Sequence, residues 1–466
     1  MSPLKAGLLP LYIKLYDDIN PTWRKPLVAF IEKLIPRLKQ LGVEIEAAPI
    51  CCVESEFKTA VKALEGKGLD ALITLHLAYS PSLESAAILA KTKLPIVVLD
   101  TTTDFAFGPD TTPDLIGSNH GIHGVQDMCN LLNRNGKTFA IEVGHWEKSD
   151  VLQRVADQVR AAKLAATLRT ARVGLIGKPF VGMGDFSVPA AKLKRDLGVT
   201  TLQVTPLAVG RLLPNADNAS VEVELASDRK AFNCKKLDPK AHRQATRINV
   251  ALDRFIKKEK LSALTLNFQA VTKASGLPMM PFFGLCKAMA KGTGYAGEGD
   301  VLTAALVGSL MSVYPETSFT EMFCPDWKGG RIFMSHMGEI NPSLAENPPA
   351  LYLRKPWIFS DAEPPVSLGA CFKPGKAIFV NLAPTRDGYN LITAPVTMVS
   401  GGKNIKFKHT IRGWMKPTLP LNDFLGEYSR AGGTHHAALV YGASLAALAS
   451  FSQLMGFKFI SIQKGC

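Results

Sequence analysis

The sequence lacks the features that mark several large protein classes. No stretch approaches the run of about 20 apolar residues that spans a membrane, and the first apolar run is too short for a secretory signal. The eight cysteines form no CxxC pair and no regular framework, which is typical of a reduced compartment. Low-complexity tracts and short internal repeats are also missing. These absences predict a soluble, cytoplasmic protein with no membrane partner.

Positive charge exceeds negative charge, but its distribution argues against nucleic-acid binding. The chain holds 54 lysines and arginines against 40 acidic residues, a net charge of +14. The basic residues are spread along amphipathic segments such as 238–260, and the densest short run, 403–412, has no recognisable binding module around it. The glycine-rich stretch 177–186 has neither GxGxxG spacing nor a GK[ST] ending. We therefore predict a tight turn there, and no nucleic-acid partner.

The first 170 residues alternate between short apolar runs and amphipathic helices. Such an alternation predicts a parallel sheet covered on both faces. The predicted strands are residues 8–16, 43–52, 69–77, 94–100 and 137–144, and the predicted helices are residues 21–41, 57–64, 83–91, 120–132 and 149–171. We place a boundary near Thr170, so that residues 1–170 form a first α/β domain.

Two further domains are expected. Residues 171–325 alternate again, with strands predicted at 172–180, 199–206 and 261–268 and helices at 241–258 and 301–314. From residue 326 the sequence changes to short β-rich runs broken by Pro, Gly and Asn, at 331–337, 350–355, 376–383, 389–400 and 404–414, and ends with a helix at 441–456 and a strand at 457–463. The predicted fold is α/β, with two successive doubly wound parallel-sheet domains followed by a β-rich, barrel-like C-terminal domain over 326–466.

Glutamates and histidines recur in short distinctive frames in the second half of the chain. Glu298 lies in GYAGEGD, Glu321 in SFTEMF, His336 in SHMGEINPS, and the pair His435 and His436 in GGTHHAA. Two carboxylates and two imidazoles form a mixed ligand set that suits Mn, Co, Fe, Ni or Zn. If they converge in the fold, they predict a metal-dependent enzyme with positions open for substrate oxygens. Spacing alone does not distinguish His435 from His436.

Each of these residues also has a purely structural interpretation. Glu298 and Asp300 precede a predicted helix, where acidic residues favour the N-terminus. Glu321 alone would be an ordinary loop acid. His336 lies among apolar residues of a predicted strand, where a histidine is more often a hydrogen-bonded core residue than a ligand. The occurrence of four such motifs together, with glycines around Glu298, favours the functional interpretation.

The four frames are similar to the metal-site motifs of L-arabinose isomerase and occur in the same order. The segment NHGIHGVQD further resembles the family's substrate-contacting segment, in which His123 takes the place of the contacting histidine. The family belongs to a broader group, including L-fucose isomerase, that interconverts aldoses and ketoses. The resemblance implies a small sugar substrate, a homo-oligomer, which in the family is often a hexamer, and Mn²⁺ or another divalent transition metal. It also implies the ligand set, in which the second histidine of the pair is used: Glu298, Glu321, His336 and His436.

Moving a proton between C1 and C2 of a sugar requires an electrophile at the carbonyl and a base at the carbon. A bound metal would supply the first by polarising both oxygens. Glu298 and Glu321 would share the proton transfers, with the order of acid and base left open. We predict His435, Asp300 and Tyr16 as further substrate contacts, Tyr16 because it lies at the carboxyl end of the first predicted strand, where α/β domains place ligand-binding loops.

The substrate class and one alternative function remain open at this stage. The N-terminal segment departs from L-arabinose isomerase, so a modified, deoxy or anionic sugar is compatible with the sequence as well as an L-arabinose-like or L-fucose-like one. The alternative is a non-catalytic sugar-binding or sensory protein, because two successive α/β domains also describe periplasmic-type binding modules. Such a module needs neither a metal cluster nor a β-rich C-terminal domain.

Overall fold

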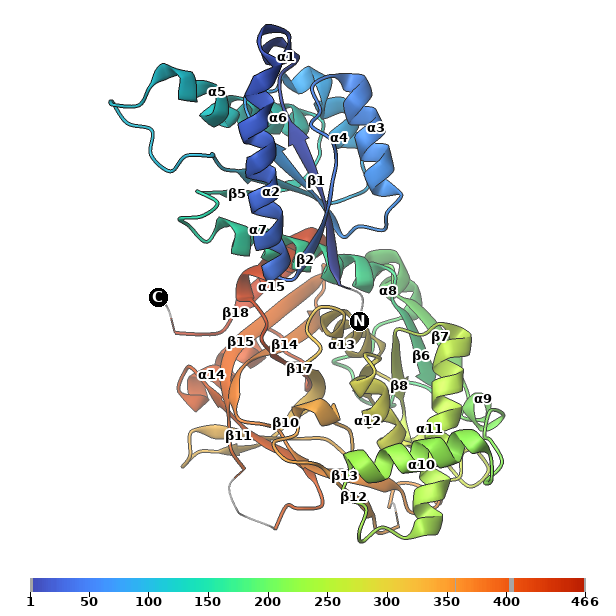
Figure 1. The fold of residues 1–466 in the computed structure, drawn as a ribbon. Helices are drawn as coiled ribbons and strands as arrows, with labels where there is room; N and C mark the ends of the chain where they lie inside the picture. The colour runs from blue at the N-terminus through green and yellow to red at the C-terminus, as the bar shows by residue number, and fades with distance from the viewer. Residues whose placement is uncertain (1–2, 357, 402–405, 465–466) are drawn as a thin grey trace. The chain divides into compact units, whose positions relative to one another are not determined.

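The computed structural model describes residues 3–356, 358–401 and 406–464 (Figure 1). Residues 403–405 of the basic run, which include the start of the strand predicted at 404–414, and Cys466 lie outside the described residues. The chain forms two compact units. Unit 1 is Met1–Ala166 with Ala446–Leu454, and unit 2 is Thr167–Leu445 with Met455–Cys466.

Unit 1 is built on a five-stranded sheet in which all neighbours are parallel, in the order β2-β1-β3-β4-β5 (Figure 1). The strands are β1 (Leu4–Leu11), β2 (Val43–Ala47), β3 (Ala71–His76), β4 (Ile96–Asp100) and β5 (Phe139–Val143). The helices are α1 (Lys14–Ile19), α2 (Arg24–Gln40), α3 (Glu54–Glu65), α4 (Ala86–Lys91), α5 (Ile116–Asn119), α6 (Gly121–Arg134), α7 (Val151–Arg169) and α15 (Leu445–Met455), with short 3₁₀ turns at Pro21–Trp23, Ser82–Glu84 and Pro113–Leu115. The predicted alternation of strand and helix is confirmed.

Apolar side chains cover both faces of this sheet. In β1, Leu8 belongs to the core shared with α2 and α7, whereas the next residue, Leu9, belongs to the core shared with α3 and α6. Successive side chains of a strand point to opposite faces, so a strand buried on both faces has to be apolar throughout. For this reason β1 ends at Leu11, earlier than predicted, and the chain from Lys14 onward, with its charged side chains, forms the exposed helix α1.

Unit 2 contains a four-stranded parallel sheet in the order β7-β6-β8-β9. Its strands are β6 (Arg172–Ile176), β7 (Thr200–Val204), β8 (Ala263–Leu266) and β9 (Gly294–Gly297). The helices of unit 2 are α8 (Ala190–Leu197), α9 (Leu207–Gly210), α10 (Ala219–Ala231), α11 (Pro239–Glu259), α12 (Phe282–Ala290), α13 (Val301–Met311) and α14 (Leu421–Arg430), with 3₁₀ turns at Phe268–Ala270 and Pro342–Leu344. Every residue of α13 is buried, because the helix contacts the parallel sheet and also the second sheet of the unit.

The second sheet of unit 2 has nine strands and forms a partial ring. Its order is β12-β13-β16-β11-β10-β17-β14-β15-β18, and β15 also pairs with β16, which brings the sheet back on itself. The strands are β10 (Thr317–Asp326), β11 (Arg331–Ser335), β12 (Ala350–Leu353), β13 (Val366–Cys371), β14 (Gly375–Pro384), β15 (Tyr389–Val399), β16 (Ile411–Pro417), β17 (His436–Tyr441) and β18 (Lys458–Ser461). Only the last residues of β15 pair with β16, whereas its first residues pair with β18, so the ring is closed only in part. The predicted α/β class with a β-rich C-terminal part is confirmed.

None of the helices in the described part of the chain combines the length and apolar character needed to cross a membrane. The seven cysteines within the described ranges are all free, as a chain without a disulfide framework requires.

Candidate metal centre

Strand register brings the predicted ligands of unit 2 together. Glu321 of β10 is paired with His436 of β17 on one side and with Ser335 of β11 on the other. His336 is the residue directly after Ser335, so it also lies next to Glu321. The Oε1 atom of Glu321 lies 2.9 Å from Nε2 of His436 and 3.3 Å from Nε2 of His336. Glu298 follows β9, and its Oε2 lies 3.5 Å from the same Nε2 of His436. All four side chains are buried.

The backbone around Glu298 is tightly constrained. Glu298 adopts a φ of 61°, a left-handed conformation that is uncommon for a residue with a side chain and typical of functional sites. A Cβ atom on Gly297 would lie 2.7 Å from Cε1 of His336, and one on Gly299 would lie 2.5 Å from Cα of Pro179. The two glycines therefore allow the imidazole and the neighbouring loop to approach the strand end closely.

Each of the three histidines in the cluster has a carboxylate next to its Nδ1 atom. The pairs are His336 with Glu339 at 2.6 Å, His436 with Asp300 at 3.0 Å, and His435 with Asp185 at 2.7 Å. This arrangement fixes the orientation of an imidazole and leaves Nε2 toward the opposite side, as is usual for histidines that bind metals. In all three cases Nε2 faces Glu298 or Glu321.

Burial and mutual contact set the charges within the cluster. Burial alone would raise the pKa of Glu298, but the neighbouring His435 and His436 lower it to about 2. Burial alone would lower the pKa of His436, but the surrounding carboxylates, Asp300 first, hold that pKa well above its usual value. The pKa of His336 is raised in the same way by Glu339 and Glu321. A cation that binds there would replace the protons whose uptake by the imidazoles these carboxylates favour.

Three buried atoms test whether the cluster fits a metal ion. Glu298 Oε2, His336 Nε2 and His436 Nε2 form no well-directed hydrogen bond with any part of the chain that the structure describes, although each lies 2.9–3.5 Å from a carboxylate or imidazole atom of the cluster. One ligand atom each from Glu298, Glu321, His435 and His436 lie within 4.8 Å of one another. This spread is close to the separation of about 4 Å between opposite ligands of an ion with bonds of roughly 2.0–2.2 Å. The cluster could therefore hold a divalent transition metal.

The segment 177–186, for which a tight turn was predicted, lies against the cluster. The backbone N–H of Phe180 donates to the carbonyl oxygen of Glu298 at 2.9 Å. The ring of Phe186 stacks on His436, with centroids 5.0 Å apart and an interplanar angle of 16°. Asp185 contacts His435. The one signal in the sequence was the position of this segment after a predicted parallel strand, at the sheet edge where α/β proteins place ligands.

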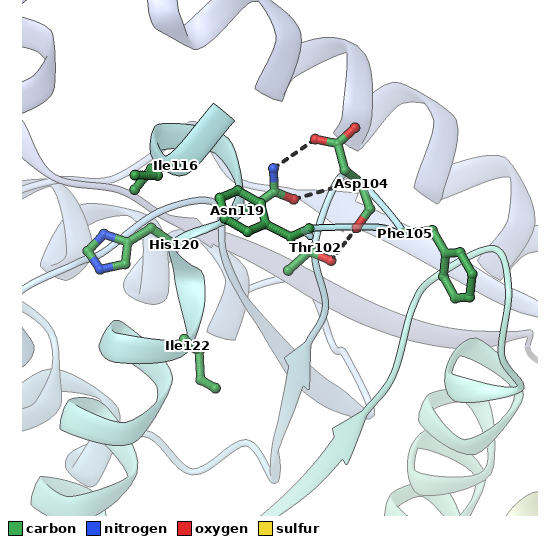
Figure 2. Close-up of a pocket in the computed structure, with 8 residues that line it drawn as sticks. Thr102, Asp104, Phe105, Ile116, Asn119, His120 and Ile122 are labelled. Atoms are coloured by element: carbon green, nitrogen blue, oxygen red, sulfur yellow. Dashed lines mark hydrogen bonds between the residues drawn. The ribbon is translucent and has the colours of Figure 1, made fainter. Parts of the chain in front are cut away.

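His123 and Tyr16, the two remaining predicted substrate contacts, belong to unit 1. His123 is exposed in the first turn of α6, with its Nδ1 atom 2.8 Å from Nε2 of His120. Tyr16 lies in α1 and packs edge-on against Tyr12 and Trp23. His120 also lines a pocket beyond the carboxyl end of β4, shown in Figure 2. The other lining residues are Thr102, Asp104, Phe105, Phe107, Ile116, Asn119 and Ile122.

Models of two domains of one known protein family match most of unit 2. A model of the L-arabinose isomerase central domain matches residues 193–315. A model of the L-arabinose isomerase C-terminal domain matches residues 316–458. The two matches are contiguous and together cover more than half of the 466 residues, including every residue of the cluster except Asp185.

Similar proteins give the same family over a longer stretch. An L-arabinose isomerase from Shouchella clausii is 23% identical over 447 residues, which cover 94% of this chain and 90% of the relative. L-arabinose isomerases from Herpetosiphon aurantiacus and Vibrio parahaemolyticus are 26% and 25% identical over 75% and 82% of this chain, and over 72% and 79% of their own lengths. Among solved structures, an ABC transporter solute-binding protein from Agrobacterium vitis bound with α-D-tagatopyranose matches 56% of this chain and 76% of its own at 12% identity, with a TM-score of 0.17. That score is too low to support the alternative of a sugar-binding module.

Proposed function

Because the chain belongs to the L-arabinose isomerase family, a family of aldose–ketose isomerases, we propose that the cluster around Glu298 is the active site of a metal-dependent isomerase acting on a pentose or hexose. One observation supports this assignment above the others. Three buried atoms of the cluster, from Glu298, His336 and His436, form no well-directed hydrogen bond among the described residues, and they converge within 2.9–3.5 Å contacts of the two glutamates. Buried groups left in this state are suited to a ligand that the protein binds.

The proposed metal ligands are Glu298, Glu321, His336 and His436, with Mn²⁺ as the ion. When bound, the ion would polarise the O1 and O2 oxygens of the sugar. Glu339 and Asp300 hold the two imidazoles through Nδ1, so that each Nε2 atom is directed to the carboxylates before anything binds. Little rearrangement of the buried side chains is then needed on binding.

Glu298 and Glu321 are the proposed proton carriers between C1 and C2 through an enediol intermediate. Both are buried carboxylates, yet their surroundings differ. Glu298 lies beside the half-buried His435, whereas Glu321 lies between two buried imidazoles. Two carboxylates in different environments can divide the work, one removing the proton from carbon while the other exchanges a proton with oxygen.

The other predicted site residues receive different roles. Asp300 is fully buried, and its two oxygens accept from the backbone N–H of Thr303 and face Nδ1 of His436. We therefore propose that Asp300 acts on the substrate only through His436. His435, which is partly exposed, is the proposed substrate contact within unit 2. His123 and Tyr16 are proposed contacts from unit 1.

The finer properties of the enzyme are proposals as well. An L-arabinose-like or L-fucose-like sugar is the proposed substrate, and the proposed assembly is a homo-oligomer such as a hexamer, in the cytoplasm. The three-domain division at residues 170 and 325 is also retained as a proposal.

A substrate panel tests the proposed activity. The purified protein, stripped of metal and reloaded with Mn²⁺, is incubated with pentoses, hexoses, deoxyaldoses and acidic aldoses, and ketose formation is followed by NMR in D₂O. We expect one sugar class to be converted, with solvent deuterium appearing at the carbon that receives the proton. Conversion without deuterium incorporation would contradict proton transfer by the glutamates, because a direct hydride shift carries no solvent atom.

Substitution of the carboxylates tests the proposed roles. Glu298→Gln and Glu321→Gln keep nearly the same shape but remove the base, so turnover should fall by at least about 10²-fold in each. Glu363→Gln, an exposed glutamate of the same unit, is the matched control and should retain the activity of the unmodified protein. Full activity in either of the first two variants would rule out that residue as a proton carrier.

A further inference from the structure

Asp185 makes two contacts with a single residue, His435. Its Oδ2 atom accepts a hydrogen bond from the backbone N–H of His435 at 3.0 Å and lies 2.7 Å from Nδ1 of the same residue. The opposite ring nitrogen, Nε2, lies 3.5 Å from Oε2 of Glu298. The imidazole is therefore held between a carboxylate outside the proposed ligand set and a carboxylate within it.

This pair differs from the two other histidine–carboxylate pairs in its exposure. The side chains of His435 and Asp185 are 38% and 37% exposed, whereas those of His336 and Glu339 are both 2% exposed. The pair of His436 and Asp300 is fully buried. A sugar entering the cluster from solvent can thus reach His435 without displacing either buried pair.

The loop that carries Asp185 is fixed on both sides of it. Phe186 packs its ring on His436. Upstream, Asn267 donates from Nδ2 to the carbonyl oxygen of Lys178 at 2.9 Å, and Phe180 donates to the carbonyl oxygen of Glu298. Asp185 is therefore held in place opposite His435 by contacts that do not involve His435 itself.

We propose that Asp185 is a positioning residue that fixes the ring of His435, so that Nε2 faces Glu298 and the incoming sugar. A carboxylate can only accept hydrogen bonds, so Asp185 holds the backbone N–H and the Nδ1 side of His435 and leaves the Nε2 side of the ring toward the substrate. An amide in the same place lacks the negative charge that holds the ring. This inference rests on the proposed isomerase function and adds to it the residue that orients the substrate-facing histidine.

The test compares Asp185→Asn with Asp185→Glu, in the unmodified protein and in a His435→Gln background. Asp185→Asn should lower kcat/KM by about 10- to 100-fold, as expected when the support of a site histidine is lost. Asp185→Glu, which keeps a carboxylate, should recover part of this loss. In the His435→Gln background Asp185→Asn should change kcat/KM by less than about twofold, because the residue then has nothing to orient. Asp196→Asn, a surface aspartate paired with Lys192, is the matched control and should retain full activity.

A direct Mn²⁺ titration by calorimetry provides a readout other than activity. If His435 faces the sugar, Asp185→Asn should bind Mn²⁺ within about threefold of the unmodified protein. A parallel loss of Mn²⁺ affinity would overturn the proposal, because His435 would then be a metal ligand supported by Asp185. Undiminished kcat/KM in Asp185→Asn, or an equal loss in the His435→Gln background, would overturn it too. Failure of the Mn²⁺-loaded unmodified protein to isomerise any sugar would instead refute the proposed function itself.

Discussion

Gly297→Ala should weaken metal binding without changing any proposed ligand. The new Cβ atom would lie 2.7 Å from Cε1 and 2.8 Å from Nε2 of His336, whereas ordinary van der Waals contact begins at 3.4 Å. The imidazole would have to move by about 0.7 Å, or the end of β9 by a similar amount. Ligand distances in metal sites vary by only about 0.2 Å, so a displacement of this size exceeds what the coordination can absorb.

The neighbours of His336 prevent an easy escape of the ring. Its Nδ1 atom is held by Glu339, and its face packs against Phe319 with centroids 4.7 Å apart. The extra methyl group therefore overpacks the site, at a cost of about 1–3 kcal/mol in the free energy of unfolding. We expect Mn²⁺ affinity to fall by at least about tenfold and kcat by about 10²-fold, the usual consequence of a misplacement near 1 Å.

Calorimetric titration of the metal-free protein with Mn²⁺ measures the first quantity, and the ketose assay measures the second. Gly388→Ala is the matched control, because a Cβ atom there meets nothing within 4 Å and the position lies in the turn between β14 and β15. It should leave both quantities unchanged. If Gly297→Ala binds Mn²⁺ as tightly as the control, then Nε2 of His336 is not a metal ligand, and the approach of its ring to β9 has another purpose.

Two further predictions concern buried groups. Glu339→Gln should lower Mn²⁺ affinity by about 10- to 100-fold, because the charge that orients His336 through Nδ1 is lost, and an affinity equal to that of Glu363→Gln would refute this role. His76 is 3% exposed, neither of its ring nitrogens has a hydrogen-bond partner in the described ranges, and burial lowers its pKa to about 3. Below pH 6.5 the unfolded chain therefore binds a proton at His76 that the folded chain does not bind. The free energy of unfolding should then fall by about 1.4 kcal/mol per pH unit toward pH 3. The free energy of unfolding of His76→Met, measured with denaturant at pH 6.5 and pH 5, should depend less on pH than that of the unmodified protein, by about this amount per pH unit. An identical pH dependence in the two proteins would mean that His76 is protonated in the folded state.

The sequence predicted the fold where local pattern and burial agree. The strands of both parallel sheets are short apolar runs, and long amphipathic helices such as α2 and α11 lie close to their predicted positions. Helix α12 was not predicted, because nearly all its residues are buried and it carries no polar face to reveal its period. Strand β10, which carries Glu321, was not predicted, since its burial on contact with β11 and β17 is a property of the assembled sheet.

Glu298, Glu321, His336 and His436 stood out in the sequence because each lies in a short frame that resembles a family motif. The carboxylate that each histidine contacts through Nδ1 could not be found in this way. Asp300 is separated from His436 by 136 residues and Asp185 from His435 by 250, so both pairs exist only through the tertiary fold. Pairing over such distances depends on strand order and loop path, which a single sequence does not encode locally.

The GYAGEGD frame can be recognised in the sequence, but the physical reasons for its residues appear only in the structure. Gly297 leaves space for the ring of His336, and Gly299, at a φ of 90°, leaves space for Pro179 of the adjoining loop. Glu298 between them adopts a φ of 61°, a conformation that costs a residue with a side chain about 1–2 kcal/mol and that a glycine would adopt freely. A glycine there would lack the carboxylate. Asp300 then caps α13 and orients His436 at the same time. Four consecutive residues thus contact three distant parts of the chain, at Pro179, His336 and His436, and also the start of α13. A shift in spacing or an exchange of either glycine would therefore disturb several contacts at once, and replacing Glu298 by glycine would relieve the strained φ only by removing the carboxylate from the cluster.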